Sequence, residues 1–150
     1  MTRVDFYVLE DDAEQARERF ACRLVEKAWR LKNTVYLHAA SPVAAQRLDA
    51  LLWTWSDRSF LPHVLAEPDL DADLAAATPV RIGTGAEPGF EAQLLVNLDR
   101  EVPLFFSRFD RVAEIVGGSD EERALARDRF RFYRDRGYAL ETHRIGSAST

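Results

Sequence analysis

The sequence predicts a three-layer α/β/α fold with a mostly parallel central sheet, Rossmann-like but without a nucleotide-binding site. Short runs of β-branched and aromatic residues alternate with longer segments of helical periodicity, which is typical of parallel βαβ units. The chain has 150 residues, of which 47% are hydrophobic and 30% charged, as in an ordinary globular domain. We therefore expect one domain over residues 1–145 and a frayed tail over 146–150.

Two strands and two helices are expected in the first part of the chain. The run Val4–Leu9 predicts a strand, and Asp11–Asp12 offers N-caps for a helix that continues to about Leu31. The buried face of that helix follows from i, i+4 spacing and comprises Phe20, Leu24, Ala28 and Leu31, widened by Ala21, Val25 and Trp29. A second strand is expected at Thr34–Ala39, and Ser41–Pro42 begins a helix that runs to about Ser56.

The remainder of the chain is expected to alternate strands with shorter connections. A short strand or extended loop is expected at Ser59–His63, and residues 67–73 form an acidic, turn-rich loop. The later elements are strands at Pro79–Ile82, Ala92–Leu98 and Val112–Val116, a short helix at Val102–Phe109, and a strand at Tyr138–Ile145. This alternation predicts right-handed crossover connections within a parallel sheet.

The last helix carries the clearest local signals. Ser119, followed three residues later by Glu122, is a capping-box pattern, in which each side chain bonds the other's free backbone N–H. Gly137 marks the end, because glycine tolerates the left-handed conformation past a helix terminus. Acids in the first turn and arginines in the last turn also suit the helix dipole. The pattern therefore predicts a helix over Ser119–Gly137.

One side of this helix places arginines around an aromatic ring. Leu125 and Phe132 supply an apolar stripe for the core, with Ala126 and Tyr133 beside them. The other side presents Arg123, Arg127, Phe130, Arg131 and Arg134. The chain has a net charge of -5, yet six of its 20 basic residues lie within Arg123–Arg136. This side suits an acidic partner with an apolar anchor, although a solvated charged face would give the same pattern.

The sequence lacks the motifs of a nucleotide, metal or nucleophilic site. The loop Gly83–Gly89 has no phosphate-binding lysine and does not follow the first strand. His38, His63 and His143 are isolated in the sequence, so no metal site and no cofactor is predicted. Cys22 is the only cysteine, which excludes an internal disulfide, and no serine lies in a nucleophile elbow. We therefore expect a binding protein and not an enzyme.

A second feature is the aromatic segment in and after the second predicted helix. Trp53 and Trp55 are two residues apart, so both cannot face the core side of a helix, and Phe60, Pro62 and His63 follow. Exposed aromatic residues beside proline and histidine indicate a protein interface. The alternative is that Trp53 lies in the core and Trp55 covers the helix end.

Five segments spread over the whole length carry a family resemblance. They are V-D-F-Y-V-L at the start, R-L-D-A-L-L-W (Arg47–Trp53), S-F-L-P-H (Ser59–His63), Q-L-L-V-N-L, and A-R-D-R-F-R-F-Y-R-D-R-G-Y (Ala126–Tyr138). In this combination the chain resembles the chi subunit of bacterial DNA polymerase III holoenzyme, a small accessory protein of the clamp-loader complex. The resemblance implies a three-layer α/β/α fold without enzymatic activity.

The resemblance also implies two protein partners. One is the acidic C-terminal tail of single-stranded DNA-binding protein (SSB), which ends in a Pro-Phe carboxylate. Its site would comprise Val116, Arg123, Arg127, Phe130 and Arg131, with Arg134 on the same side of the helix. The other partner is the psi subunit, which tethers chi to the clamp loader, and its patch would comprise Trp53, Phe60, Pro62 and His63. Family members often carry lysine at positions 123 and 131 and tyrosine at position 130.

Two other functions stay open from the residues alone. The arginine side of the helix could bind single-stranded nucleic acid directly, with bases stacking on Phe130. A phosphate- or nucleotide-processing enzyme would instead use the C-terminal strand ends, near Asp11, Asp12 and Ser41. No apolar run of about 18 residues and no apolar signal core is found, which predicts a cytoplasmic protein without membrane contact. Contact with DNA is expected to be indirect.

Overall fold

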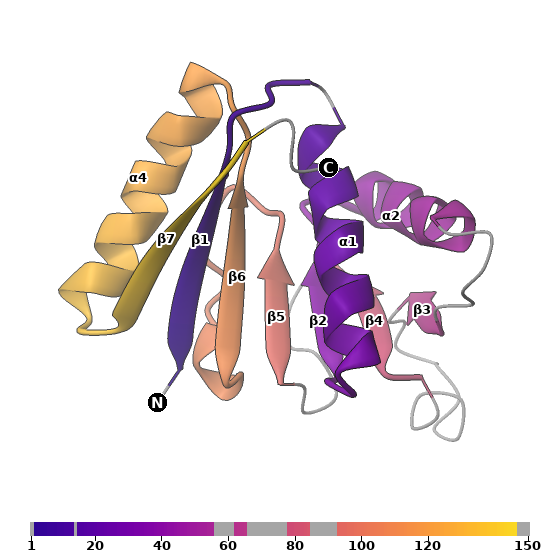
Figure 1. Cartoon of the computed structure of the whole chain (residues 1–150). Coiled ribbons are helices and arrows are strands. Elements are labelled where there is room, and N and C mark those ends of the chain that lie inside the picture. Colours follow the sequence, from indigo (N-terminus) through magenta and orange to yellow (C-terminus); the bar gives the residue numbers. More distant parts are fainter. Residues whose placement is uncertain (1, 14, 56–61, 66–77, 85–92, 147–150) are drawn as a thin grey trace.

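Seven strands form one fully parallel sheet in the described part of the chain (Figure 1). This computed structural model describes all residues except 1, 14, 56–61, 66–77, 85–92 and 147–150. The strands are Arg3–Leu9 (β1), Val35–His38 (β2), His63–Leu65 (β3), Val80–Gly83 (β4), Leu94–Asn97 (β5), Arg111–Val116 (β6) and Ala139–Ile145 (β7). The described helices are Ala16–Arg30 (α1), Pro42–Thr54 (α2) and Asp120–Asp135 (α4), with a 3-10 turn at Phe106–Arg108 (η1). The strand order is β3-β4-β2-β5-β6-β1-β7, so the predicted α/β class is confirmed.

Helices cover opposite faces of the sheet at its two ends. The apolar residues of α1 and α2, such as Val25 and Leu48, pack with those of β2, β4 and β5 on one face. Those of α4 and η1, such as Tyr133 and Phe106, pack with β1 and β6 on the other face. Figure 1 shows α4 beside β7 at one end of the sheet and α1 and α2 toward the other. Central strands are therefore covered on both faces, which is why they appear as continuous apolar runs.

Local signals set the starts of α2 and α4. Ser41 Oγ accepts a backbone N–H of the first turn of α2, and Ser119 Oγ accepts the N–H of Glu122 at 3.2 Å. Only the serine half of the predicted capping box is found among the described contacts, because the Glu122 carboxylate pairs with Arg17 (3.4 Å). After α4, Gly137 has a φ of 81°, the left-handed conformation that glycine adopts at little cost.

The first helix begins later than the sequence predicted. Asp11–Asp12 does not cap it, because Asp11 closes a turn of its own: its Oδ1 accepts the N–H of Ala13 and its carbonyl accepts the N–H of Gly118. The buried face agrees with the prediction at Ala21, Val25 and Ala28, but Leu31 is 67% exposed and Phe20 is only partly buried. The buried residues of α1 are Ala16, Ala21, Cys22, Val25 and Ala28.

The helix expected at Val102–Phe109 is reduced to the single turn η1. Phe109 already has extended dihedral angles that lead into β6, so only one turn fits after Pro103. The strand or loop expected at Ser59–His63 is described only at its end, where β3 begins at His63. Predictions for residues 67–73, for most of the loop 83–89 and for 147–150 lie outside the described residues.

Candidate functional site

A pocket of about 290 Å³ lies between α4 and the β6, β1 and β7 end of the sheet. Four of the six residues predicted for tail binding line it: Val116, Arg123, Arg127 and Phe130. We call it the arginine pocket and define it by Phe6, Val8, Val116, Arg123, Ala126, Arg127, Phe130, Thr142 and Arg144. It therefore combines apolar side chains with three guanidinium groups.

The apolar side of the arginine pocket comes from alternate residues of neighbouring strands. Phe6 and Val8 of β1 and Val116 of β6 point to the face that α4 covers. Phe130 packs edge-on against Phe6, with 5.4 Å between ring centroids, and is partly buried. An apolar side chain that enters the pocket would meet Phe130 and these strand residues.

The arginines of the pocket differ from their neighbours in having no acidic partner. Within the described residues, Arg123, Arg127 and Arg144 form no ion pair, and the Nε of Arg123 is buried without an acceptor. The neighbouring Arg131 and Arg134 instead pair with acids of their own helix, each at 3.2 Å. In a protein with a net charge of -5, three unpaired guanidiniums at one pocket favour an anionic ligand.

Two residues predicted for the site lie outside the pocket, and two unpredicted residues line it. Arg131 and Arg134 lie further along α4. Thr142 and Arg144 were missed because they belong to β7, and their place beside α4 depends on the order of strands in the sheet. The alternation of side chains along Tyr138–Ile145 gives the only sequence signal, and it indicates which residues share a face but not what covers that face.

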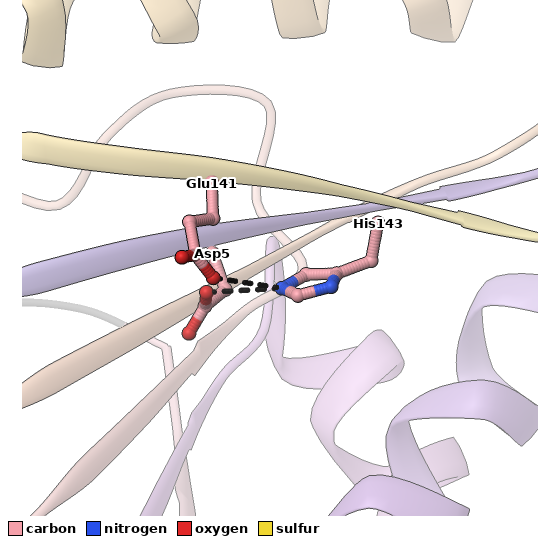
Figure 2. Close-up of side chains that lie close together, drawn as sticks. All are labelled: Asp5, Glu141 and His143. Atoms are coloured by element: carbon pink, nitrogen blue, oxygen red, sulfur yellow. Dashed lines mark hydrogen bonds and ion pairs between the residues drawn. The ribbon is translucent and has the colours of Figure 1, made fainter.

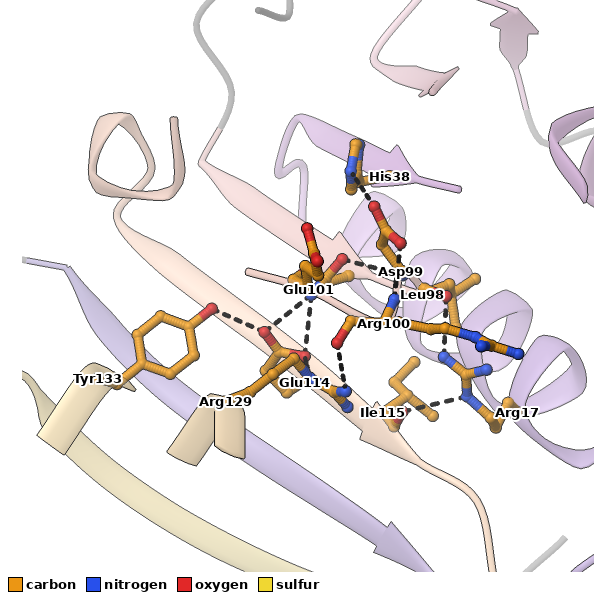
Figure 3. A network of polar contacts seen from close by, with 11 residues as sticks. Arg17, His38, Leu98, Asp99, Arg100, Glu101, Glu114, Ile115, Arg129 and Tyr133 are labelled. Atoms are coloured by element: carbon orange, nitrogen blue, oxygen red, sulfur yellow. Dashed lines mark hydrogen bonds and ion pairs between the residues drawn. The ribbon is translucent and has the colours of Figure 1, made fainter. Parts of the chain in front are cut away.

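A buried polar network joins α4 to the sheet (Figure 3). The carboxylate of Glu114 on β6 accepts hydrogen bonds from Arg129 Nε at 2.9 Å and from the Tyr133 hydroxyl at 2.7 Å. Asn97 Nδ2 also donates to both carboxylate oxygens, and Arg129 donates to the carbonyl of Arg100 at 3.1 Å. Burial, and then the Glu114 carboxylate, raise the pKa of Tyr133 far above its ordinary value. The Tyr133 hydroxyl therefore stays a donor.

This network corrects the predicted orientation of α4. The sequence placed Leu125 and Phe132 toward the core, yet both are only partly buried, whereas Arg129 is 6% exposed. The buried residues of α4 are Ala126, Arg129 and Tyr133. The missed signal was Glu114 within the apolar strand V-A-E-I-V, because a buried carboxylate needs a charged or hydrogen-bonding partner.

The aromatic patch is only partly available to a partner. Trp53 is 53% exposed, and its ring centroid lies 4.5 Å from that of His63. The His63 side chain is itself fully buried beside Trp53, and its predicted place in the patch stays a prediction. Trp55 is partly buried against the core, so the alternative with Trp53 inside is wrong. Pro62 is half-buried, and Phe60 lies outside the described residues.

Charged side chains, Arg17 and Glu122 among them, line a pocket of about 180 Å³ at the position where doubly wound folds bind nucleotides. Beyond the carboxyl ends of β5 and β6, Arg17 donates to the carbonyls of Leu98 at 2.9 Å and Ile115 at 3.3 Å (Figure 3). The Glu122 carboxylate lies over Gly117 so closely that a side chain at position 117 would overlap it. A carboxylate at the start of α4 repels phosphate, so this position does not favour the phosphate groups of a nucleotide.

One group of described side chains has a geometry that could hold a metal ion (Figure 2). Ligand atoms of Asp5, Glu141 and His143 all lie within 4.8 Å of one another. Two guanidiniums already face these carboxylates: Arg111 is 3.4 Å from Asp5, and Arg3 is 3.4 Å from Asp5 and 3.1 Å from Glu141. A cation would have to displace them, so the cluster is best understood as ion pairs that join β7 to β1 and β6.

Comparison with known proteins decides the family. The family described as DNA polymerase III chi subunit, HolC, matches residues 1–141. The chain belongs to this chi family. DNA polymerase III subunit chi of Pseudomonas aeruginosa is 48% identical over 145 residues, which cover 97% of this chain and 98% of the relative. That of Escherichia coli is 29% identical over 148 residues, which cover 95% and 97%. The resemblance seen in the sequence is confirmed, and this chi-family chain is an accessory subunit in DNA replication.

Solved structures of other proteins show the fold alone. The chi-family chain is similar to T4 UvsW with a TM-score of 0.69 and 9% identity, over 97% of this chain and 42% of that one. It is similar to the C-terminal domain of a Saccharomyces cerevisiae Dbp5 variant bound to Gle1 and IP6 with a TM-score of 0.62 and 11% identity, over 97% and 90%. At such identities the likeness carries no functional argument. None of the described helices is long and apolar enough to cross a membrane.

Proposed function

We propose that this chain is a non-catalytic subunit that binds the acidic C-terminal tail of SSB and links it to the clamp loader through psi. The observation that carries the proposal is the convergence of the unpaired Arg123, Arg127 and Arg144 with Phe130 and Val116 in one pocket. A terminal Pro-Phe carboxylate offers the complementary groups, since its ring suits the apolar side chains and its carboxylate suits a guanidinium.

The terminal phenylalanine of the tail should contribute more to the binding free energy than any of the acidic residues that precede it. Burying a phenylalanine side chain stabilises a complex by about 1.5–3 kcal/mol. A charge-assisted bond from arginine to the terminal carboxylate adds about 1.5–3 kcal/mol. Each exposed ion pair to Arg131 or Arg134 adds only about 0.2–1 kcal/mol. After the entropic cost of association, we expect micromolar affinity, or about -8 kcal/mol.

Fluorescence anisotropy with a labelled peptide of the SSB tail tests the pocket. Arg127→Ala should weaken binding at least about tenfold, because a bond to a charged group is lost. Arg136→Ala is the matched control, since the Arg136 guanidinium lies 3.5 Å over the Phe132 ring and does not line the pocket. A peptide without its terminal phenylalanine should bind hardly at all.

Two results would contradict this assignment. Equal losses for Arg127→Ala and Arg136→Ala would show a diffuse charge effect without a specific pocket. Tighter binding of a bare single-stranded oligonucleotide than of the tail peptide would instead support direct nucleic-acid binding, with bases stacked on Phe130.

The link to psi is proposed to lie at Trp53 on α2, away from the arginine pocket. An exposed tryptophan at the centre of an interface contributes about 2 kcal/mol or more. Trp53→Ala should therefore reduce co-purification with psi or the clamp loader and leave tail binding unchanged. A variant that loses tail binding to the same extent would show that the two sites are not separate.

The proposal also excludes catalysis by this chain. Because the Glu122 carboxylate at the nucleotide position repels phosphate, purified protein should neither hydrolyse nucleotide nor extend a primer. ATP turnover that follows the protein through purification would contradict a non-catalytic role. We place the protein in the cytoplasm, together with the replication complex that it serves.

A further inference from the structure

In the part of the chain that the structure describes, the last strand, β7, leaves one edge of the sheet open. It ends the strand order, and among the described residues only β1 pairs with it. The carbonyl of Ile145 accepts the N–H of Glu10 at 3.0 Å, so the backbone groups of Ile145 point toward β1. Because these groups alternate in direction along a strand, those of Leu140, Thr142 and Arg144 point out of the sheet.

The open edge is continuous with the arginine pocket. The side chains of Thr142 and Arg144 line the pocket, and the backbone groups of the same residues face outward. β7 is seven residues long, and every one of its residues is exposed or half-buried. A strand edge of this kind is a template for pairing with another extended segment.

We propose that the tail residues that precede the anchor pair with β7 as an added strand, parallel to the rest of the sheet. This inference rests on the tail binding proposed above. The carboxyl-terminal part of β7 lines the pocket, so a terminal residue bound there places the preceding residues beside Thr142 and then beside Leu140. That direction is parallel to β7.

The charges on α4 follow the same path. Arg127, Arg131 and Arg134 lie on successive turns, and at a rise of 1.5 Å per residue the first and last are about 10 Å apart. About three residues of an extended strand span the same distance, so successive tail carboxylates can meet successive arginines. The present partners Asp128 and Asp135 are exposed, so these ion pairs are weak and exchangeable. The added strand thus gives Arg131 and Arg134 a role outside the pocket.

Tail peptides with one N-methyl group at successive backbone positions test the pairing. A parallel strand bonds its neighbour through every second residue. Methylation at these alternate positions should weaken binding to the unmodified protein about threefold to tenfold, and at the intervening positions by less than about twofold. Equal effects at neighbouring positions, or no effect at any position, would overturn the added strand.

Thr142→Pro tests the same contact from the protein side. Proline removes the outward N–H of residue 142 and is tolerated at a strand edge whose N–H faces solvent. Thr142→Val is the reference, because it changes the same pocket side chain but keeps the N–H. Proline should weaken tail binding about threefold to tenfold relative to valine, with thermal melting to check the fold of both variants.

The outcomes separate the two proposals. If the unmodified peptide does not bind the wild-type protein, tail binding itself fails. If it binds, and neither methylation nor Thr142→Pro changes the affinity, only the added strand is refuted. If Thr142→Pro does not fold, the peptide series on the wild-type protein decides.

Discussion

Replacing Arg129 with methionine tests whether the buried network holds α4 on the sheet. Arg129→Met leaves the Glu114 carboxylate fully buried without its cation, although Asn97 and Tyr133 still donate to it. Breaking a buried ion pair by removing one partner costs about 3–5 kcal/mol. Methionine keeps most of the apolar stem of arginine, so the loss of stability comes from the missing charge more than from a change in volume.

The matched control is Arg131→Met, the same substitution two residues further along α4. Arg131 pairs with Asp128 at 3.2 Å, but its side chain is 57% exposed. An exposed pair of this kind contributes about 0.2–1 kcal/mol. Urea unfolding followed by circular dichroism gives the free energy of unfolding of both variants. If the dependence of this free energy on urea concentration is unchanged, the two variants have comparable denatured states.

The reasoning is refuted if Arg129→Met costs less than about 1 kcal/mol or no more than Arg131→Met. The double variant Glu114→Gln, Arg129→Met sharpens the test, because glutamine removes the unpaired charge and keeps an acceptor for the Tyr133 hydroxyl. Part of the lost stability should return. Absence of any recovery would assign the cost to packing.

Three further outcomes are expected. Gly118→Ala should lower the free energy of unfolding by about 1–3 kcal/mol in urea, because a Cβ would lie 2.7 Å from the carbonyl oxygen of Glu10; an unchanged midpoint would contradict this. Burial lowers the pKa of His38 below 6.5 against the opposing effect of Asp99, so the unfolded chain binds this proton more readily and stability should fall as the pH drops below 6.5. His38→Gln should flatten that dependence in thermal melts, and an unchanged dependence would assign it to another group. Burial raises the pKa of Cys22 to about 12, so a thiol reagent should label the unfolded protein but not the folded one.

Elements with strong local signals were predictable, and the order of strands was not. The expected strands at Thr34–Ala39 and Ala92–Leu98 correspond to β2 and β5, whose residues are buried at every position and therefore form apolar runs. No local sequence signal indicates that β1 lies between β6 and β7. The contributions of Thr142 and Arg144 to the arginine pocket could therefore not be derived from the sequence.

Helix α4 likewise has some features that could be predicted from the sequence and others that could not. Its ends follow from Ser119 and Gly137, which act on neighbouring backbone groups. Its buried face depends on a partner in another strand, because Glu114 draws Arg129 and the Tyr133 hydroxyl inward. Periodicity treats every arginine as a surface residue, so it could not separate Arg129 from the arginines around it.

The placement of β1 between β6 and β7 has a consequence for synthesis on the ribosome. β1 is made first, yet both of its neighbours come from the far end of the chain. At about 5–20 residues per second, translation leaves the edges and apolar residues of β1 unpaired for roughly 5–20 s, a state prone to aggregation. Because β6, α4 and β7 all contribute to the arginine pocket, a nascent or truncated chain that lacks β7 cannot complete it. Interrupted products would therefore not compete with the finished subunit for its ligand.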